Sequence, residues 1–337
     1  IFAAVNHGSA AASGWGIPTA TDIAFAVGIL SILGDRVPVS LKVFLTALAI
    51  ADDLIAILVV ALFYGGTINF GLLGIAFVLI AGVLLMNKLG EKRGWFYLVP
   101  AIAIWSLFYY AGIHSTMSGV VMAFLVPMTP RFSEAYFNRK RRQYIRRLNE
   151  YNSIESTSSE FPNGPQRHCL RRLSAISRDS MGMSYRLEHA LGPWVNFLIM
   201  PIFALANAGV EIPDVSYFNV FHFDQALGSV SMGIFLGLVL GKPLGISLAS
   251  FIAVKLRFGE MPAKATWTML IAVACLGGIG FTMSIFVDTL SFSDQTPEVM
   301  ARLRDMGKVA VLMGSLFAGI LGSVLINVVH AIQSRKS

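Results

Sequence analysis

Charged residues are scarce in this chain of 337 residues, because Asp, Glu, Lys and Arg together make up only 13% of it. A soluble domain carries about 25% of such residues, so roughly half of the usual charge is missing. Hydrophobic residues make up 55% of the sequence. This composition excludes an ordinary soluble domain and indicates a membrane protein.

Cysteine is also scarce, with Cys169 in a polar stretch and Cys275 in an apolar one. Two cysteines placed in this way offer neither a disulfide framework nor a cluster of metal ligands. The six histidines are scattered and form no HxxxH pair of the kind that binds zinc. The sequence therefore predicts no cofactor.

A starting methionine is missing, and residues 1–5 read like the tail of an apolar segment. No basic region precedes that segment, so it does not match a signal peptide. We expect the chain to be a fragment of a longer protein.

The apolar residues are grouped into nine segments. A membrane-spanning helix needs about 20 residues, and the shorter segments are compatible with broken or tilted helices. We therefore expect five crossings in residues 1–130 and four in residues 187–337, separated by a polar stretch at 131–186. The segments are 17–33, 39–64, 69–86, 95–111, 113–127, 193–209, 227–253, 267–288 and 308–332.

The positions of Lys and Arg support two crossings within 95–127, separated at Gly112–Ser115. With two crossings, one side of the membrane holds nearly all basic residues, and the other side holds Arg302, Arg304 and Lys308. A single crossing would put the two main basic loops on opposite faces. Basic residues favour the cytoplasmic side, so we expect a cytoplasmic carboxyl end. The basic side holds Arg36, Lys42, Lys88, Lys92, Arg93, twelve residues between Arg131 and Arg186, Lys255, Arg257, Lys264, Arg335 and Lys336.

The stretch 131–186 is basic and serine-rich, and it shows little helical periodicity after about Tyr151. Its arginine clusters could indicate nucleic-acid binding. The preferred interpretation is a cytoplasmic loop whose charge fixes the topology and contacts anionic lipid, without nucleic acid as a partner.

Four ionisable residues lie deep in apolar segments: Asp22, Asp52, Asp53 and Lys242. A charge in the middle of a bilayer costs at least about 2.5–3.5 kcal/mol, so each of these residues needs a reason to be there. Asp52 and Asp53 point about 100° apart on a helix, so one can line a cavity while the other faces a neighbouring helix. Carboxylate oxygens can hold either a proton or a hard cation such as sodium, and exchange requires only that both compete for one site.

Two of the apolar segments are interrupted by glycine, proline or threonine. GIPTATDIAFAVG contains Asp22, and CLGGIGFTMSIF lies near the other end of the chain. Paired interruptions indicate crossed, broken helices at an ion site, although such glycines could also serve close helix packing. Asp22 would suit the positive ends of the half-helices, and Lys242 the negative ends.

Lys242 requires an acidic partner, and Asp52 or Asp53 is the obvious one, either for transport or as a structural salt bridge. Asp288 ends its segment and is expected at the membrane interface. His114 is a candidate pH-sensing group. Glu188 and His189 open the segment after the basic stretch and could gate the site.

Several motifs closely resemble the NhaA-type sodium/proton antiporters of bacteria. The likeness runs in order from about residue 14 to the end, apart from the 131–186 stretch. It is carried by TDIAF, ADDL, GKPLG and GIGFTMSIF, and by RLEHALGPWVNFLIMPIFALANAGV. The resemblance implies an all-α polytopic inverted-repeat fold of twelve helices, of which this chain holds the fourth to twelfth, with two interrupted, crossed transmembrane helices.

The resemblance also implies roles for individual residues. The ion-binding aspartate pair of the family falls on Asp52 and Asp53, with Asp53 the more directly tied to sodium binding. The threonine and aspartate of the interrupted helix fall on Thr21 and Asp22, and the membrane lysine falls on Lys242, where a salt bridge to Asp52 is expected.

Positions implicated in the pH response of the family fall on His114, Glu188 and His189. Gly192 replaces a histidine of the family pattern, and the 131–186 stretch is longer than in familiar members. The first two helices of the family, which carry the dimer hairpin and further acids, are expected to be absent. The expected activity is electrogenic exchange of Na⁺ or Li⁺ for H⁺ by alternating access at the inner membrane, not an enzymatic reaction, with a homodimer possible for the full-length protein.

Two other functions use membrane acids. An intramembrane aspartyl protease needs two acids facing each other from separate helices, commonly with a GxGD motif, which the sequence lacks. A sodium-coupled carrier of organic anions needs a cavity for the solute. Adjacent acids and a lysine favour small cations instead.

Overall fold

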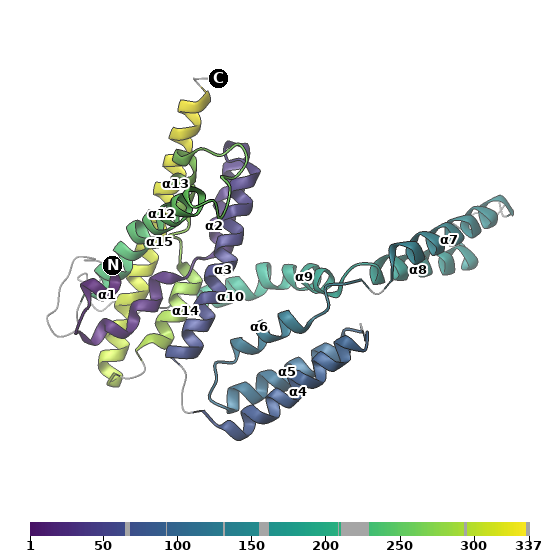
Figure 1. The fold of residues 1–337 in the computed structure, drawn as a ribbon, viewed down its shortest axis with the longest axis horizontal. Helices are drawn as coiled ribbons and strands as arrows, with labels where there is room; N and C mark the ends of the chain where they lie inside the picture. The colour runs from purple at the N-terminus through teal and green to yellow at the C-terminus, as the bar shows by residue number, and fades with distance from the viewer. Residues whose placement is uncertain are drawn as a thin grey trace. The chain divides into compact units, whose positions relative to one another are not determined.

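The computed structural model describes residues 1–64, 68–91, 93–130, 132–154, 162–207, 209, 229–292 and 295–334. Every regular element within these ranges is a helix (Figure 1), which agrees with the all-α class that the resemblance implies. Residues 210–225, which follow the sixth apolar segment, lie outside the described residues, as do the basic residues Lys92, Arg131, Arg335 and Lys336.

The chain divides into two compact units, which are described separately. The first combines residues 1–65 with residues 199–337, and the second comprises residues 66–198. The first unit therefore joins segments from both ends of the sequence.

The amino-terminal part of the first unit contains one short helix, one interrupted helical segment and one long helix. Its elements are α1 (Phe2–Val5), the 3₁₀-helix η1 (Ala10–Thr19), α2 (Ile23–Leu33), the short 3₁₀-helix η2 (Gly34–Arg36) and α3 (Val39–Phe63).

The carboxyl-terminal part supplies the remaining helices of this unit. They are α10 (Met200–Asn207), α11 (Val230–Leu236), the π-helical turn η5 (Gly237–Gly241), α12 (Lys242–Lys255), α13 (Trp267–Leu276), α14 (Phe281–Ser291) and α15 (Pro297–Ser334).

Two apolar clusters hold the first unit together. One contains Leu238 and Phe292 and joins η1, η5, α14 and α15, while the other contains Leu45 and Leu276 and joins α2, α3, α13 and α15. Other large apolar side chains, such as Ile32, are exposed. Such surfaces are suited to contact with lipid tails, which are as apolar as leucine.

The second unit contains three apolar helices followed by a polar pair. Its elements are α4 (Phe70–Lys88), α5 (Trp95–Tyr110), α6 (Thr116–Leu125), α7 (Glu134–Ile154), α8 (Gly164–Asp179), α9 (Met183–Trp194) and the π-helical turn η3 (Val195–Ile199), which continues into α10.

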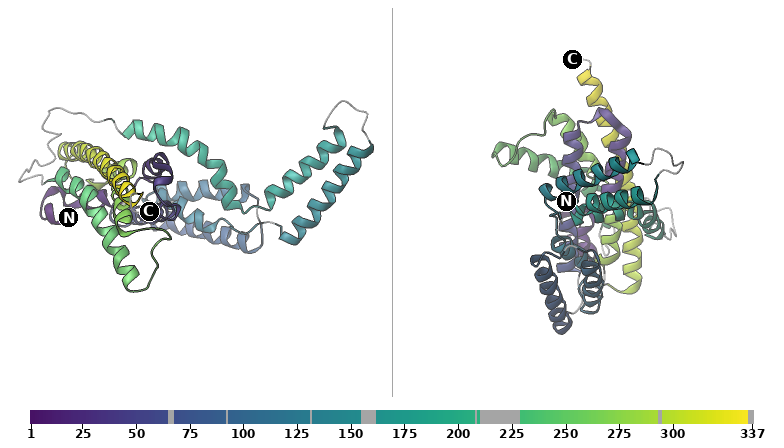
Figure 2. Two further views of the ribbon diagram at one scale, coloured as in Figure 1. Left: turned by 90° about the horizontal axis from the view of Figure 1, so that it is seen from above. Right: turned by 90° about the vertical axis from the view of Figure 1, so that its right-hand side faces the viewer.

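The polar pair contains a helix that the sequence pattern did not indicate. Helical periodicity is weak after about Tyr151, yet α8 forms and packs beside α7 as a helical hairpin (Figure 2). The side chain of Asn163 caps α8 by accepting from the backbone N–H of Gln166, and the Gln166 side chain accepts from the N–H of Asn163. This reciprocal cap starts the helix, and Cys169 is buried within the hairpin.

The described helices match the apolar segments of the sequence. Five are long and apolar enough to cross a membrane, or seven if each of two bent pairs counts as one span, and α5 and α6 are shorter apolar helices. The bent pairs are η1 with α2–η2, bent by 41°, and α13 with α14, bent by 52°.

Candidate functional site

The two bent helix pairs meet at their interruptions. The first break is at residues 20–22 and the second at residues 277–280. The backbone N–H of Asp22 donates to the carbonyl oxygen of Ile279 at 2.6 Å. The two breaks thus pair an N–H group of one with a carbonyl group of the other, and both groups would otherwise lack a partner where a helix is interrupted.

Glycine makes this close approach possible at Gly278. A Cβ atom at that position would lie 3.1 Å from the Cβ of Ala318 on α15 and would collide with the carbonyl oxygen of Leu238. The break therefore packs directly against the backbone of η5 and against α15. A residue with a side chain would force these elements apart.

Asp22 lies at the N-termini of two half-helices. One carboxylate oxygen caps α2 by accepting from the backbone N–H of Phe25 at 3.2 Å. The other accepts from the backbone N–H of Thr282 at 3.0 Å and from the Thr282 hydroxyl, at the start of α14. Since helix N-termini carry partial positive charge, they stabilise an ionised carboxylate that is 1% exposed.

Lys242, Asp52 and Thr21 form a compact polar group from three elements. Lys242 Nζ lies 2.5 Å from Asp52 Oδ2 and donates to Thr21 Oγ1 at 2.7 Å. The Thr21 hydroxyl lies 2.8 Å from Asp52 Oδ2 and 3.0 Å from the carbonyl oxygen of Gly277, so it can donate to either one. The ion pair joins α12 to α3 beside the first break.

Asp53, although adjacent in sequence, has a different environment. Its Oδ1 atom is buried and has no hydrogen-bond partner among the described residues. The charges of Asp22, Asp52 and Lys242 all act on it. One acid of the pair is therefore held by an ammonium group, while the other keeps a buried oxygen available for a proton or a cation.

A pocket of about 590 Å³ has Asp52 and Lys242 in its wall, together with Trp15, Thr19 and Gly241. A volume of this size lies within the range of small-molecule sites, so volume alone does not distinguish a hydrated cation from an organic solute. The charged lining consists of one acid and one base that are already paired. An organic anion would thus find no free positive group on this wall.

The candidate pH-responsive residues lie in the second unit. His114 follows α5, its Nδ1 atom lies 2.9 Å from Thr116 Oγ1, and burial lowers its pKa. Glu188 and His189 lie in α9, where His189 Nδ1 is 3.0 Å from the carbonyl oxygen of Tyr185. His189 is exposed. The groups gathered around Asp22 all belong to the first unit.

The protein surroundings of Asp288, which the sequence places at the end of its apolar segment, were not expected. It lies within α14, is 0% exposed, and neither carboxylate oxygen has a hydrogen-bond partner among the described residues. The sequence does contain a clue to this burial. Asp288 lies four residues after Ser284 and three before Ser291, and these spacings place all three polar residues on one helix face.

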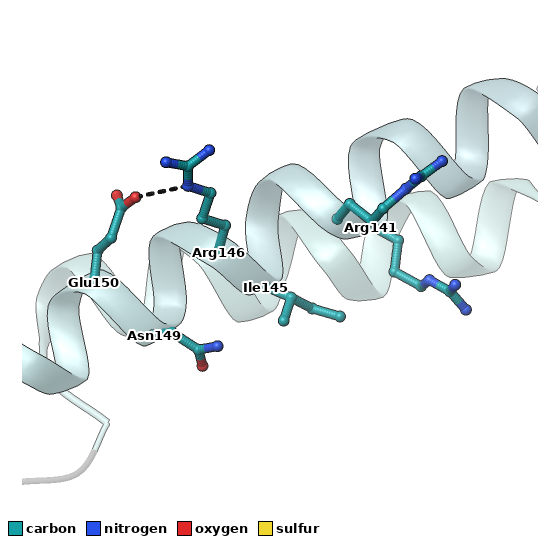
Figure 3. A pocket seen from close by; sticks show the side chains of 6 residues that line it. Arg141, Ile145, Arg146, Asn149 and Glu150 are labelled. Carbon is teal, nitrogen blue, oxygen red and sulfur yellow. Dashed lines mark hydrogen bonds and ion pairs between the residues drawn. The ribbon is translucent and has the colours of Figure 1, made fainter.

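No resident metal centre is evident in the part of the chain that the structure describes, where no three His, Cys, Asp or Glu side chains are gathered as ligands. A further pocket lies on α7 and is lined by Arg141, Ile145, Arg146 and Asn149, among others (Figure 3). Arg146 pairs there with Glu150 at 3.2 Å, and both side chains are largely exposed. An exposed pair of this kind contributes little to stability.

The sequence matches known transporters over nearly its whole length. The family model described as Na⁺/H⁺ antiporter 1 matches residues 1–326. A protein of Syntrophobacter fumaroxidans named Na(+)/H(+) antiporter NhaA is 40% identical over 327 residues, which cover 96% of this chain and 66% of that protein.

Proteins of the same name from two other bacteria show similar identity and coverage. The one from Oleidesulfovibrio alaskensis is 40% identical over 97% of this chain and 70% of its own length. The one from Bacteroides thetaiotaomicron is 39% identical over 98% of this chain and 71% of its own length. The chain thus spans about two thirds of the length of these relatives.

Proposed function

Because the chain belongs to the Na⁺/H⁺ antiporter 1 family, we propose that it exchanges Na⁺ or Li⁺ for H⁺ across the bacterial inner membrane by alternating access. It would thereby contribute to pH and sodium homeostasis. The exchange needs no catalytic residue and no cofactor, since the ions themselves are the substrates.

The observation that carries this proposal is the contrast between Asp52 and Asp53. Asp52 is paired with Lys242 at 2.5 Å, whereas Asp53 has a buried oxygen without a partner among the described residues. An unpaired buried carboxylate is unfavourable until it takes up a proton or a cation. Competition between H⁺ and Na⁺ for this acid couples their movements.

Lys242 has a role in the same competition. A sodium ion that approaches Asp52 must replace the ammonium group as the partner of the carboxylate. When sodium leaves, Lys242 can return, and the ion pair restores the neutral state of the site. This exchange of partners avoids an isolated charge in a low-dielectric interior.

In the proposed site, Asp52 and Asp53 hold Na⁺ and exchange protons. Thr21 and the carbonyl oxygen of Gly277 offer further neutral oxygens, which suit a hard cation. Asp22 compensates the N-termini of α2 and α14. His114, Glu188 and His189 are proposed to adjust the activity to pH, a role that rests on the resemblance to the family.

The proposed arrangement in the membrane follows from the distribution of basic residues. Residues 1–130 would contribute the fourth to eighth helices of the family and residues 187–337 the ninth to twelfth. The polar stretch 131–186 and the carboxyl end would face the cytoplasm. The full-length protein would be able to form a homodimer in the lipid bilayer.

The aspartyl protease alternative has less support from the geometry. Asp52 and Asp53 are neighbours on one helix, and both Asp22 oxygens already accept hydrogen bonds. The organic-anion alternative is less favoured because Lys242 is already paired. Uptake of a labelled organic anion that depends on sodium and moves no protons would support that alternative.

The test uses everted membrane vesicles from cells that produce the protein. A fluorescent dye reports the collapse of a preformed pH gradient when NaCl or LiCl is added. We expect collapse with the wild type, loss of the response with Asp53→Asn, and an unchanged response with Asp35→Asn, which removes an exposed acid of the same charge. No response of the wild type at neutral or alkaline pH would refute Na⁺/H⁺ exchange.

A further inference from the structure

Asp288 is a buried acid that the exchange described above does not use. It lies on α14, six residues after Thr282, whose backbone and hydroxyl bind Asp22. At 1.5 Å per residue, the separation along the helix axis is about 9 Å. Asp288 therefore lies between the central acids and the end of the unit where α14 ends.

The surroundings of Asp288 leave its carboxylate without a partner. It is fully buried, and both oxygens lack a hydrogen-bond partner among the described residues. Gly307 on α15 provides the space, because a Cβ atom there would lie 2.8 Å from Asp288 Cγ and closer still to one oxygen. A buried carboxylate in this condition is strongly unfavourable unless it binds a proton or a cation.

Other polar groups continue from Asp288 along the same helix face. Ser284, Asp288 and Ser291, here called the α14 stripe, are spaced by four and three residues and are 0%, 0% and 2% exposed. The Ser291 hydroxyl donates to the carbonyl oxygen of Val287 at 2.7 Å, and the Tyr64 hydroxyl donates to the carbonyl oxygen of Ser13 at 2.5 Å. These two hydroxyl groups lie at the C-terminal ends of α14 and α3.

The charged groups near Asp288 do not form a simple ion pair with it. Positive charges of Arg304 and Lys308 and the negative charge of Asp305 act on it from α15. Lys308 Nζ instead donates to the carbonyl oxygen of Gly209 at 3.1 Å and lies 4.0 Å from Asp305 Oδ1. Arg304 Nε is buried and makes no hydrogen bond with any described residue.

The other elements packed against α14 add few charges. No ionisable side chain lies in η1 or α10, and α3 contributes Lys42 and the central acids Asp52 and Asp53. An acid in this position can receive a proton from one end of the α14 stripe and release it towards the other. Buried acids of transporters commonly act in such relays.

We propose that Asp288 and the α14 stripe form a proton relay that carries H⁺ between the central acids and the end of the first unit where α14 ends, a role that rests on the proposed antiport. In the proposed orientation this is the external side. A proton binds Asp288, passes to the central carboxylates as sodium leaves them, and Asp288 is then free to accept the next proton. Sodium itself does not use this relay.

The test compares two exchange modes of the purified full chain in proteoliposomes. Proton-driven uptake of ²²Na⁺ requires net proton transfer, whereas ²²Na⁺/Na⁺ self-exchange at equal pH on both sides requires only that the sodium-loaded site change its access. For Asp288→Asn we expect proton-driven uptake to fall by at least about tenfold, with self-exchange within about twofold of wild type. Asp288→Glu, which keeps a carboxyl group, should restore part of the proton-driven rate.

Matched variants separate the relay from general damage. Ser284→Ala should slow proton-driven uptake alone, and it serves as the test if Asp288→Asn does not accumulate. Glu298→Gln, which removes an exposed acid in the first turn of α15, should change neither mode. Equal loss of both modes in Asp288→Asn, or loss of neither, would overturn the relay. Absence of both modes in the wild type would instead refute the antiport.

Discussion

Thr282 holds Asp22 with two donors, its backbone N–H at 3.0 Å and its hydroxyl. The acid is 1% exposed, so water cannot replace a donor that is removed. A hydrogen bond to a charged group contributes about 1.5–3 kcal/mol. The hydroxyl of Thr282 thus stabilises the contact between the two broken helices as well as the charge of Asp22.

Thr282→Val keeps the shape of the side chain and removes only the hydroxyl. We expect the free energy of unfolding in detergent to fall by about 1.5–3 kcal/mol, measured by thermal unfolding. Thr289→Val on the same helix is the control, because among the described residues that hydroxyl donates to a backbone carbonyl oxygen, that of Phe286 at 2.7 Å, and not to an acid. Equal losses for the two variants would show that the contact with Asp22 contributes nothing special.

Individual residues differ in how well the sequence reveals them. Asp22, Asp52 and Lys242 are conspicuous because ionisable residues are rare within apolar segments. The ion pair of Lys242 with Asp52, expected from the resemblance, is present at 2.5 Å. The burial of Asp288 could not be predicted, because distance from a segment end indicates depth along a helix, whereas burial depends on packing against α15, and in particular on Gly307.

At the scale of elements, the two broken helix pairs depend on glycine at their contact. Gly278 faces the backbone of Leu238 and the side chain of Ala318, with no room for a methyl group. Gly28 lies in α2, where a Cβ atom would have no other atom within 4 Å. The two glycines therefore serve different purposes, although both lie in interrupted segments.

Gly278→Ala should disturb the contact between the breaks. We expect a loss of about 1–3 kcal/mol in stability, together with a lower rate of exchange in the vesicle assay, because overpacking displaces the backbone near Asp22. Gly28→Ala should be neutral or stabilising by up to about 1 kcal/mol, because alanine favours the helix. If Gly278→Ala changed neither the stability nor the exchange rate, the close contact between the two helix breaks would not be required.

The helices themselves follow closely from the sequence, because a long apolar run has few alternatives in a membrane. Each expected apolar segment coincides with a described helix or bent pair. The exception is α8, which lies in a basic, serine-rich stretch. Its apolar positions are few, and they become buried only through packing with α7, a contact that a linear pattern does not reveal.

At the scale of the whole molecule, the distribution of basic residues predicts the orientation of the chain in the membrane. Nearly all of them fall on one side when 95–127 crosses twice, and α5 and α6 are separate helices, as that arrangement requires. The last helix, α15, has 38 residues and is about 57 Å long. It exceeds the hydrocarbon core of about 30 Å, so a single crossing places its two ends on opposite sides.

Reporter fusions test this orientation. Green fluorescent protein fused to the carboxyl end should fluoresce, because that end is expected in the cytoplasm, where the reporter folds. Alkaline phosphatase fused between α14 and α15 should be active, because it requires disulfides that form outside the cytoplasm. The reverse pattern would place Arg302, Arg304 and Lys308 inside and the larger basic set outside, against the positive-inside tendency. It would also move the α14 stripe to the cytoplasmic side, so that the proposed relay would connect the central acids with cytoplasmic protons instead.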